Sequence, residues 1–74
     1  MKAYQVGRVC VKTAGRDAGK LCAILDEDEE GNVLIEGETR RRYVNPNHLE
    51  PTEKTLEGVN KDTTADEILS QLSA

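Results

Sequence analysis

A glycine-rich loop between two apolar runs is the feature that most constrains how this chain folds. Residues 5–13 (QVGRVCVKT) are rich in β-branched side chains, residues 21–25 (LCAIL) are continuously apolar, and residues 14–20 (AGRDAGK) separate them. Short runs of this kind, bounded by glycines, are typical of β-strands. The segment is therefore predicted to form a β-hairpin with a loop longer than the common two-residue type.

Side chains in the first of these runs alternate in character. Val9 and Val11 fall on one face of the predicted strand, and Arg8 and Lys12 fall on the other. This alternation, together with the β-branched composition, predicts a half-exposed strand with one apolar and one charged face.

The loop sequence excludes a nucleotide-hydrolysing site. A phosphate-binding loop of that class has four residues between its glycines and a Ser or Thr after its lysine. In this chain three residues separate Gly15 from Gly19, and Leu21 follows Lys20. We expect the two glycines to supply turn conformations that other residues adopt poorly. Arg16 at the tip of the loop and Lys20 at its end would then point outward.

Three further short runs follow, separated by turn-forming segments. They comprise residues 33–37 (VLIEG), 40–45 (RRRYVN) and 48–52 (HLEPT). Pro46 and Pro51 restrict nearby pairing to the edges or ends of a sheet. Several short strands at roughly ten-residue intervals predict an all-β fold, a small barrel, which we place over residues 1–52.

The rest of the chain, residues 53–74, is expected to form a tail with one short helix. Residues 53–63 are polar and lack periodicity, which indicates a linker. Thr64 and Glu67, three residues apart, match a capping box. The apolar stripe that follows consists of Ile68, Leu69 and Leu72. These signals predict a helix of about two turns at about residues 64–72, which must dock or fray because it is short.

Length and composition favour a binding module over an enzyme. A chain of 74 residues makes one small domain, and with no Trp, no Phe and two Tyr its core must be aliphatic. Such a domain has little room for a catalytic pocket. We therefore expect no enzymatic activity, no cofactor and no small-molecule substrate. No run has the length of a membrane span and no secretory signal is evident, so a cytoplasmic protein is expected.

Two cysteines, Cys10 and Cys22, lie inside the two apolar runs. Two thiols and the single histidine cannot complete a four-ligand zinc site. Buried free thiols that pack as small hydrophobes are expected, because free cysteine is among the most buried residue types. A disulfide across the predicted hairpin stays an open alternative.

Charge is distributed in alternating blocks along the chain. The formal net charge is −4 at pH 7. Residues 1–25 carry a net charge of +4 and residues 39–49 one of +3, whereas residues 26–38 carry −7 and residues 50–74 carry −4. A basic surface for nucleic acid is therefore compatible with an acidic total.

The acidic block resembles a cation-binding loop only in part. Asp26, Asp28, Glu30 and Gly31 follow the first half of a calcium loop. The twelfth position of such a loop is a bidentate Glu, but in this chain it is Gly37, and the flanking segments are strand-like rather than helical. A solvated hairpin loop is the better interpretation, so no metal site is expected.

Three consecutive arginines are the strongest functional signal in the chain. In a strand, Arg40 and Arg42 would share one face and Arg41 would take the other. Three arginines cannot all be buried unpaired, so they lie at the surface or against opposite charge. They form either a solubilising patch paired with the acidic loop or a phosphate-binding surface, for which the planar guanidinium is well suited. Tyr43 beside them is a candidate for stacking on a base and fits a barrel position equally well.

His48 is the only histidine. It lies in the segment NPNHLEP without a recognisable catalytic arrangement of Ser, Cys or acidic residues around it. We interpret it as a structural or RNA-facing side chain.

Taken together, these segments resemble a KOW-motif domain. The resemblance rests on GRVCVKTAGRDAGKLCAILD, VLIEG, RRRYVN and HLEPT, in this order. More narrowly, the chain resembles the archaeal form of the large-subunit ribosomal protein family numbered fourteen with the "e" suffix. The resemblance covers residues 6–52 of the 74.

The resemblance implies an SH3-like barrel that packs against ribosomal RNA and neighbouring proteins of the large subunit, in the cytoplasm and without enzymatic activity. It makes Gly19 the characteristic glycine of the motif. The resemblance also places a set of basic residues at RNA, and His48 joins this set in its RNA-facing interpretation. The full set is Arg8, Lys12, Arg16, Lys20, Arg40, Arg41, Arg42 and His48.

The chain departs from this family in its charge, because family members are usually basic. The excess acid lies in residues 26–30 and after Glu50. We expect these segments to point away from RNA, toward solvent or a basic neighbouring protein. The alternative hypothesis is an SH3-like interaction module that binds a basic partner through the acidic segments.

Overall fold

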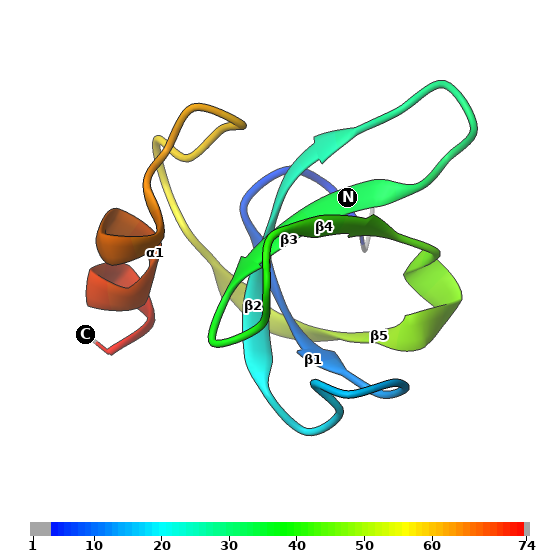
Figure 1. Ribbon diagram of the computed structural model, residues 1–74. Coiled ribbons are helices and arrows are strands. Elements are labelled where there is room, and N and C mark those ends of the chain that lie inside the picture. Colours follow the sequence, from blue (N-terminus) through cyan, green and yellow to red (C-terminus); the bar gives the residue numbers. More distant parts are fainter. Residues whose placement is uncertain (1–3, 74) are drawn as a thin grey trace.

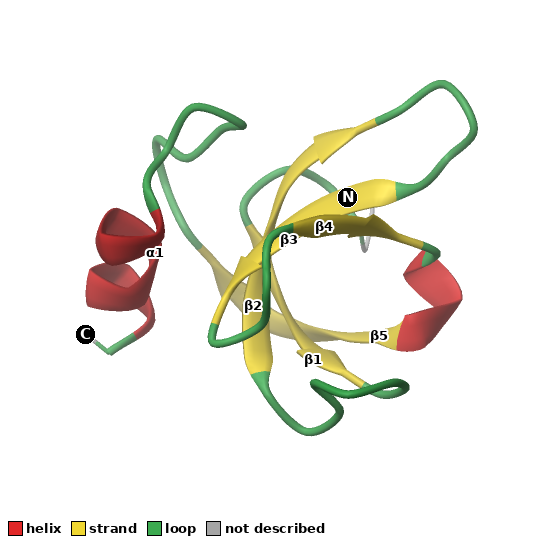
Figure 2. Ribbon diagram, viewed as in Figure 1, coloured by secondary structure: helices red, strands yellow, loops and turns green. Residues whose placement is uncertain are grey.

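A computed structural model describes residues 4–73, so residues 1–3 of the expected barrel segment and residue 74 of the expected tail lie outside the described part. Five antiparallel strands form one sheet in the order β4-β3-β2-β1-β5 (Figures 1 and 2). The strands are β1 (Arg8–Lys12), β2 (Leu21–Glu27), β3 (Val33–Gly37), β4 (Arg42–Val44) and β5 (Leu49–Thr55). A short 3-10 helix, η1 (Pro46–His48), precedes β5, and one helix, α1 (Ala65–Leu72), follows it.

The two faces of the curved sheet bury separate apolar clusters, because successive side chains of a strand point to opposite faces. The inner cluster draws on all five strands, which identifies it as the enclosed side of the sheet. It contains Cys10, Cys22, Ile24, Val33, Ile35, Val44 and Leu49, with Tyr4 against it. The outer cluster joins β1, β2 and β3 to the C-terminal segment. It contains Val9, Ala23, Leu25, Leu34, Leu56, Val59 and Ile68, with Leu21 and Leu72 against it.

This arrangement confirms the expected small all-β, SH3-like barrel with a C-terminal helix. Figure 1 shows the strands curling around one interior while α1 lies to one side of the sheet, against its outer face. The two prolines fit their expected positions. Pro46 begins η1, and Pro51 lies in β5, the strand at one end of the sheet order. Among the described residues, no helix is long and apolar enough to cross a membrane.

The prediction that β1 is half-exposed is wrong. Arg8 and Lys12 are each only 7% exposed, and Val9 on the other face is 2% exposed. The reason is that β1 lies between β2 and β5, with the barrel interior on one face and the C-terminal segment on the other. The guanidinium of Arg8 donates to the backbone oxygen of Thr52 at 3.0 Å, and the Lys12 ammonium donates to the backbone oxygen of Ala14.

The segment expected to be a linker begins as a strand and then packs on the barrel. β5 continues to Thr55, and both Leu56 and Val59 are buried in the outer cluster. The backbone of Leu56 donates to the oxygen of Gly7 at 2.7 Å. Gly7 has a φ of 96°, and a Cβ there would lie 2.6 Å from the oxygen of Leu56, so this close approach requires glycine.

Helix α1 forms where the sequence predicts it. The side chain of Thr64 accepts a hydrogen bond from the backbone N–H of Glu67, as expected of an N-cap residue. Ile68 is fully buried in the outer cluster, Leu72 packs against that cluster, and Leu69 is exposed. The short helix is therefore docked on the barrel rather than extended away from it.

The two cysteines face each other across the β1–β2 pair as free thiols. Both are fully buried in the inner cluster. Burial raises the pKa of the Cys10 thiol to about 11 and that of Cys22 to about 12. The expected packing as small hydrophobes is confirmed, and the high pKa values leave both thiols almost entirely protonated at neutral pH.

Candidate nucleic-acid interface

The glycine-rich loop adopts a tight conformation between β1 and β2. Gly15 has a φ of 82° and Gly19 a φ of 90°, values that favour glycine. The backbone N–H of Gly19 donates to the oxygen of Lys12 at 2.7 Å, and that of Lys12 donates to the oxygen of Lys20 at 2.9 Å. These bonds close the loop at its base and leave Arg16 and Lys20 exposed.

Asp17 connects this loop to the turn that joins β3 to β4. Its Oδ2 accepts a hydrogen bond from the backbone N–H of Arg40 at 3.0 Å and lies 3.5 Å from the Arg40 Nε. Its Oδ1 lies 3.7 Å from the ammonium of Lys20. The backbone hydrogen bond from Arg40, helped by the charges of Lys20 and Arg40, lowers the pKa of Asp17 below its ordinary value.

Two further contacts fix the neighbouring segments. The backbone N–H of Leu21 donates to the carboxylate of Glu38 at 2.9 Å, and the backbone N–H of Glu38 donates to the oxygen of Leu21 at 3.0 Å. On the other side of the loop, the backbone N–H of Thr13 donates to the oxygen of His48 at 2.8 Å. Residues 13–20, the turn 38–41 and η1 therefore meet at one end of the barrel, which we call the basic end.

The predicted RNA-facing residues lie at this end of the barrel or beside it, and they divide into an exposed and a buried group. Arg16, Lys20, Arg40, Arg41, Arg42 and His48 are exposed. Arg8 and Lys12 are buried, with their cationic groups on backbone carbonyls, as described above. The arginine run does not lie in one strand, because β4 begins only at Arg42. Arg40 and Arg41 precede it in the turn, so the expected alternation of faces along a strand does not apply to them.

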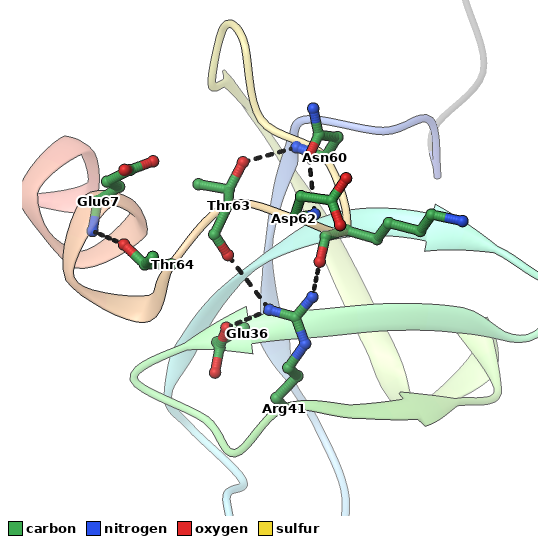
Figure 3. Close-up of polar contacts among 8 residues, drawn as sticks. Glu36, Arg41, Asn60, Asp62, Thr63, Thr64 and Glu67 are labelled. Carbon is green, nitrogen blue, oxygen red and sulfur yellow. Dashed lines mark hydrogen bonds and ion pairs between the residues drawn. The ribbon is translucent and has the colours of Figure 1, made fainter.

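Arg41 fastens the C-terminal segment to the barrel (Figure 3). One guanidinium nitrogen lies 2.7 Å from the carboxylate of Glu36 and donates to the backbone oxygen of Thr63 at 3.2 Å. The other donates to the backbone oxygen of Lys61. The loop held in this way is itself braced by a hydrogen bond from the backbone N–H of Asn60 to the Thr63 hydroxyl at 2.9 Å. The guanidinium therefore serves an intramolecular contact.

Tyr43 lies on the side of the sheet away from the barrel interior. Its ring is 44% exposed, and its hydroxyl donates to a carboxylate oxygen of Asp26 at 2.9 Å. This hydrogen bond, followed by partial burial and the nearby acidic charges, raises the pKa of Tyr43. The structure thus places the candidate stacking ring beside an acidic side chain.

The acidic residues 26–30 lie at the far end of β2 from the basic loop (Figure 1). Residues 28–32 form a hairpin loop in which Asp28 accepts hydrogen bonds from the backbone N–H groups of Glu30 and Asn32, both at 2.9 Å. Glu29 and Glu30 are exposed. Within residues 4–73 no cluster of three or more potential metal ligands occurs. We call this hairpin loop the acidic end.

Asp17 and Glu36 are the residues at this interface that sequence reasoning missed. Each acts through a partner that is far away in the chain, so no local motif identifies it. A signal exists for Asp17, because it is the one acid in residues 1–25 and lies between two cations in a loop. An isolated acid in a basic loop indicates a structural contact.

Comparison with known proteins assigns the chain to a family, although no family model matches it. The large ribosomal subunit protein eL14 of Methanococcus vannielii is 39% identical over 74 residues, which cover 100% of this chain and 95% of that protein. The eL14 protein of Sulfolobus acidocaldarius is 45% identical over 73 residues, covering 92% and 75% of the two chains. That of Desulfurococcus amylolyticus is 40% identical over 77 aligned residues, covering 97% and 79%. The chain therefore belongs to the eL14 family of large ribosomal subunit proteins.

Proposed function

We propose that this protein is a non-enzymatic structural component of the large ribosomal subunit in the cytoplasm, and that it binds ribosomal RNA through its basic end. Its relatives are named as large ribosomal subunit proteins. The observation that carries the RNA-binding part is the gathering of exposed cations from three separate segments at one end of the barrel. These residues are Arg16, Lys20, Arg40 and His48, and exposed Arg42 adjoins them at the start of β4.

The mechanism is neutralisation of backbone phosphates. Arginine and lysine side chains displace condensed counterions when they contact phosphates, and this release supplies sequence-independent affinity. In A-form RNA the accessible groups are phosphates and 2′-hydroxyls, so the shape of the RNA selects the site. Base stacking contributes little in this mechanism, since the chain has no Trp or Phe and the Tyr43 hydroxyl is engaged by Asp26.

Three of the cations predicted at RNA have other roles in this proposal. Arg8 and Lys12 support the interior of the barrel, and Arg41 holds the C-terminal segment. Phosphate binding by any of them would require it to leave its backbone carbonyl partners. We assign direct RNA contact to the other exposed cations, and we assign neighbouring ribosomal proteins to the acidic end.

Incorporation into ribosomes tests the proposal. Tagged variants are expressed in cells, and their lysates are sedimented through a density gradient in high-salt buffer. We expect the wild-type chain to sediment with the large subunit and to leave it when RNA is digested. The variant Arg42→Glu is expected to reduce incorporation at least about tenfold, because it places an acid against phosphate. The control Glu29→Lys reverses one charge at the acidic end and is expected to incorporate normally.

The alternative function, a module that binds a basic protein through its acidic segments, gives the opposite pattern. Glu29→Lys would then weaken association, Arg42→Glu would not, and digestion of RNA would leave the complex intact. Equal effects of the two substitutions would contradict the assignment of RNA to the basic end.

A further inference from the structure

A buried carboxylate lies at the centre of the surface that we assign to RNA. Asp17 is 8% exposed and belongs to the basic loop. We infer that Asp17 is a positioning residue, which joins this loop and the turn 38–41 into one preorganised phosphate-binding edge. In this case tight binding to RNA, a polyanion, depends on the acidic residue Asp17. This inference rests on the proposed function and goes beyond it, because it assigns the role to a residue that does not itself contact RNA.

Both carboxylate oxygens of Asp17 are used: Oδ2 joins the loop to the turn between β3 and β4, and Oδ1 contacts Lys20 within the loop. Oδ2 accepts from the backbone N–H of Arg40 at 3.0 Å, and Oδ1 lies 3.7 Å from the Lys20 ammonium. The Asp17 side chain is 10% exposed, whereas those of Lys20 and Arg40 are 53% and 54% exposed. The acid is thus largely covered, while much of each cation remains open to an incoming phosphate.

The arrangement has two consequences for RNA binding. One negative charge between two positive charges reduces the repulsion of Lys20 and Arg40 while the site keeps a net positive charge. The loop also contains Gly15 and Gly19, which on their own leave its backbone adaptable. A loop fixed by Asp17 loses less conformational freedom when RNA binds, which is the general advantage of a preorganised site.

Charge repulsion alone predicts the opposite effect of Asp17 on the affinity for RNA. If Asp17 were only one of many charges, removing it would strengthen binding to a polyanion. If Asp17 positions Arg40 and Lys20, removing its charge weakens binding. The substitution Asp17→Ala separates these cases, because it removes the charge beside Lys20 and Arg40 and also the oxygen that accepts the hydrogen bond from the Arg40 N–H. Glu29→Gln is the matched control, since it removes one negative charge from an exposed residue at the acidic end.

The test measures binding of the full chain to large-subunit ribosomal RNA, taken from the protein's own source and stripped of other proteins. Dissociation constants are compared at two salt concentrations for wild type, Asp17→Ala and Glu29→Gln. We expect Asp17→Ala to weaken binding about five- to tenfold, as for the loss of ordering of one or two side chains. Glu29→Gln is expected to stay within about twofold of wild type, since its charge lies far from the contact.

A double-mutant cycle distinguishes positioning from general destabilisation. If Asp17 acts through Arg40, Asp17→Ala should have much less effect in an Arg40→Ala background than in the wild type. Equal losses in the two backgrounds would overturn the inference. So would binding of Asp17→Ala that is as tight as wild type or tighter. If wild type itself fails to bind this RNA, the proposed function falls and the inference falls with it. Binding by wild type, with no loss in Asp17→Ala, removes the inference alone.

Discussion

At the scale of single residues, identical residues that are adjacent in the sequence have different structural roles. All three consecutive arginines are exposed, but only the guanidinium of Arg41 is bound to the C-terminal segment, because the chain turns before β4. The sequence predicts that these arginines lie at the surface or against opposite charge, which holds for each of them. It does not identify Arg41 as the one that binds the C-terminal segment, since its partners Glu36, Lys61 and Thr63 meet only after folding.

Replacement of Arg41 by alanine is predicted to lower the free energy of unfolding by about 1.5–3 kcal/mol, the usual range for hydrogen bonds to charged groups. The loss includes the contacts with the carbonyls of Lys61 and Thr63, which are left without this donor. Urea unfolding followed by circular dichroism measures the change in the free energy of unfolding. Arg42→Ala is the matched control, because Arg42 is exposed and has no ion pair among residues 4–73. Equal destabilisation by the two substitutions would contradict the fastening role.

Asp17 gives a prediction about pH. Its pKa in the folded protein is below the ordinary value of 3.8, so its contribution to stability is fully present above that value. The contribution is lost as the pH falls through the lowered pKa, because protonation removes the charge that Arg40 and Lys20 stabilise. The free energy of unfolding should therefore fall more steeply below about pH 4 for wild type than for Asp17→Asn. If the free energy of unfolding depended on pH in the same way for both proteins, the ionised carboxylate of Asp17 would not be stabilised in the folded state.

At the scale of elements, local patterns predict which segments become strands and helix, but not what covers them. The glycine-rich hairpin, the three later strands and the capped helix all form close to their predicted positions. The exposure of β1 and the linker at residues 53–63 are the exceptions. The linker differs because the C-terminal segment returns over the outer face of the sheet. Arg8 and Lys12 are covered for another reason, since they share a face of β1 with Cys10 and that face lines the barrel interior. Leu56 and Val59 are isolated apolar residues in a polar stretch, so periodicity does not reveal that they are buried.

Docking of α1 can be tested with two adjacent residues of the same helix. Ile68 is fully buried in the outer cluster, whereas Leu69 is 36% exposed. Ile68→Ala is predicted to reduce the free energy of unfolding by about 2–4 kcal/mol, through lost burial and the cavity left behind. Leu69→Ala is predicted to cost less than about 1 kcal/mol, because that side chain keeps much of its contact with water. Denaturant unfolding of both variants measures the two free-energy losses. Similar losses would mean that α1 is not docked in solution.

At the scale of the whole molecule, antiparallel folding converts alternating charge blocks into two opposed ends. Because β2 runs from the basic loop to the acidic hairpin, the blocks around residues 13–20 and 26–32 lie at opposite ends of one strand (Figure 1). The turn at residues 38–41 then returns its cations to the basic end through Asp17. A net charge of −4 therefore says little about which partner each end attracts.

This separation of charge predicts which end of the protein faces RNA. Ala18 and Glu29 are both exposed, one at the basic end and one at the acidic end, and each can be replaced by cysteine. An iron chelate attached to the new thiol generates hydroxyl radicals that cut nearby RNA. The two native thiols are fully buried and have a raised pKa, so the reagent should attach to the new cysteine alone.

In the complex with stripped large-subunit RNA, the chelate at position 18 is expected to cut the backbone at discrete sites, and the chelate at position 29 to cut weakly. The reason is that repulsion between the acidic end and phosphate keeps that end away from RNA at low salt, while the cations of the basic end attract it. The contrast should shrink as salt screens both effects. Stronger cleavage from position 29 would mean that RNA approaches the acidic end, and the basic end would then have to be reassigned to a protein neighbour.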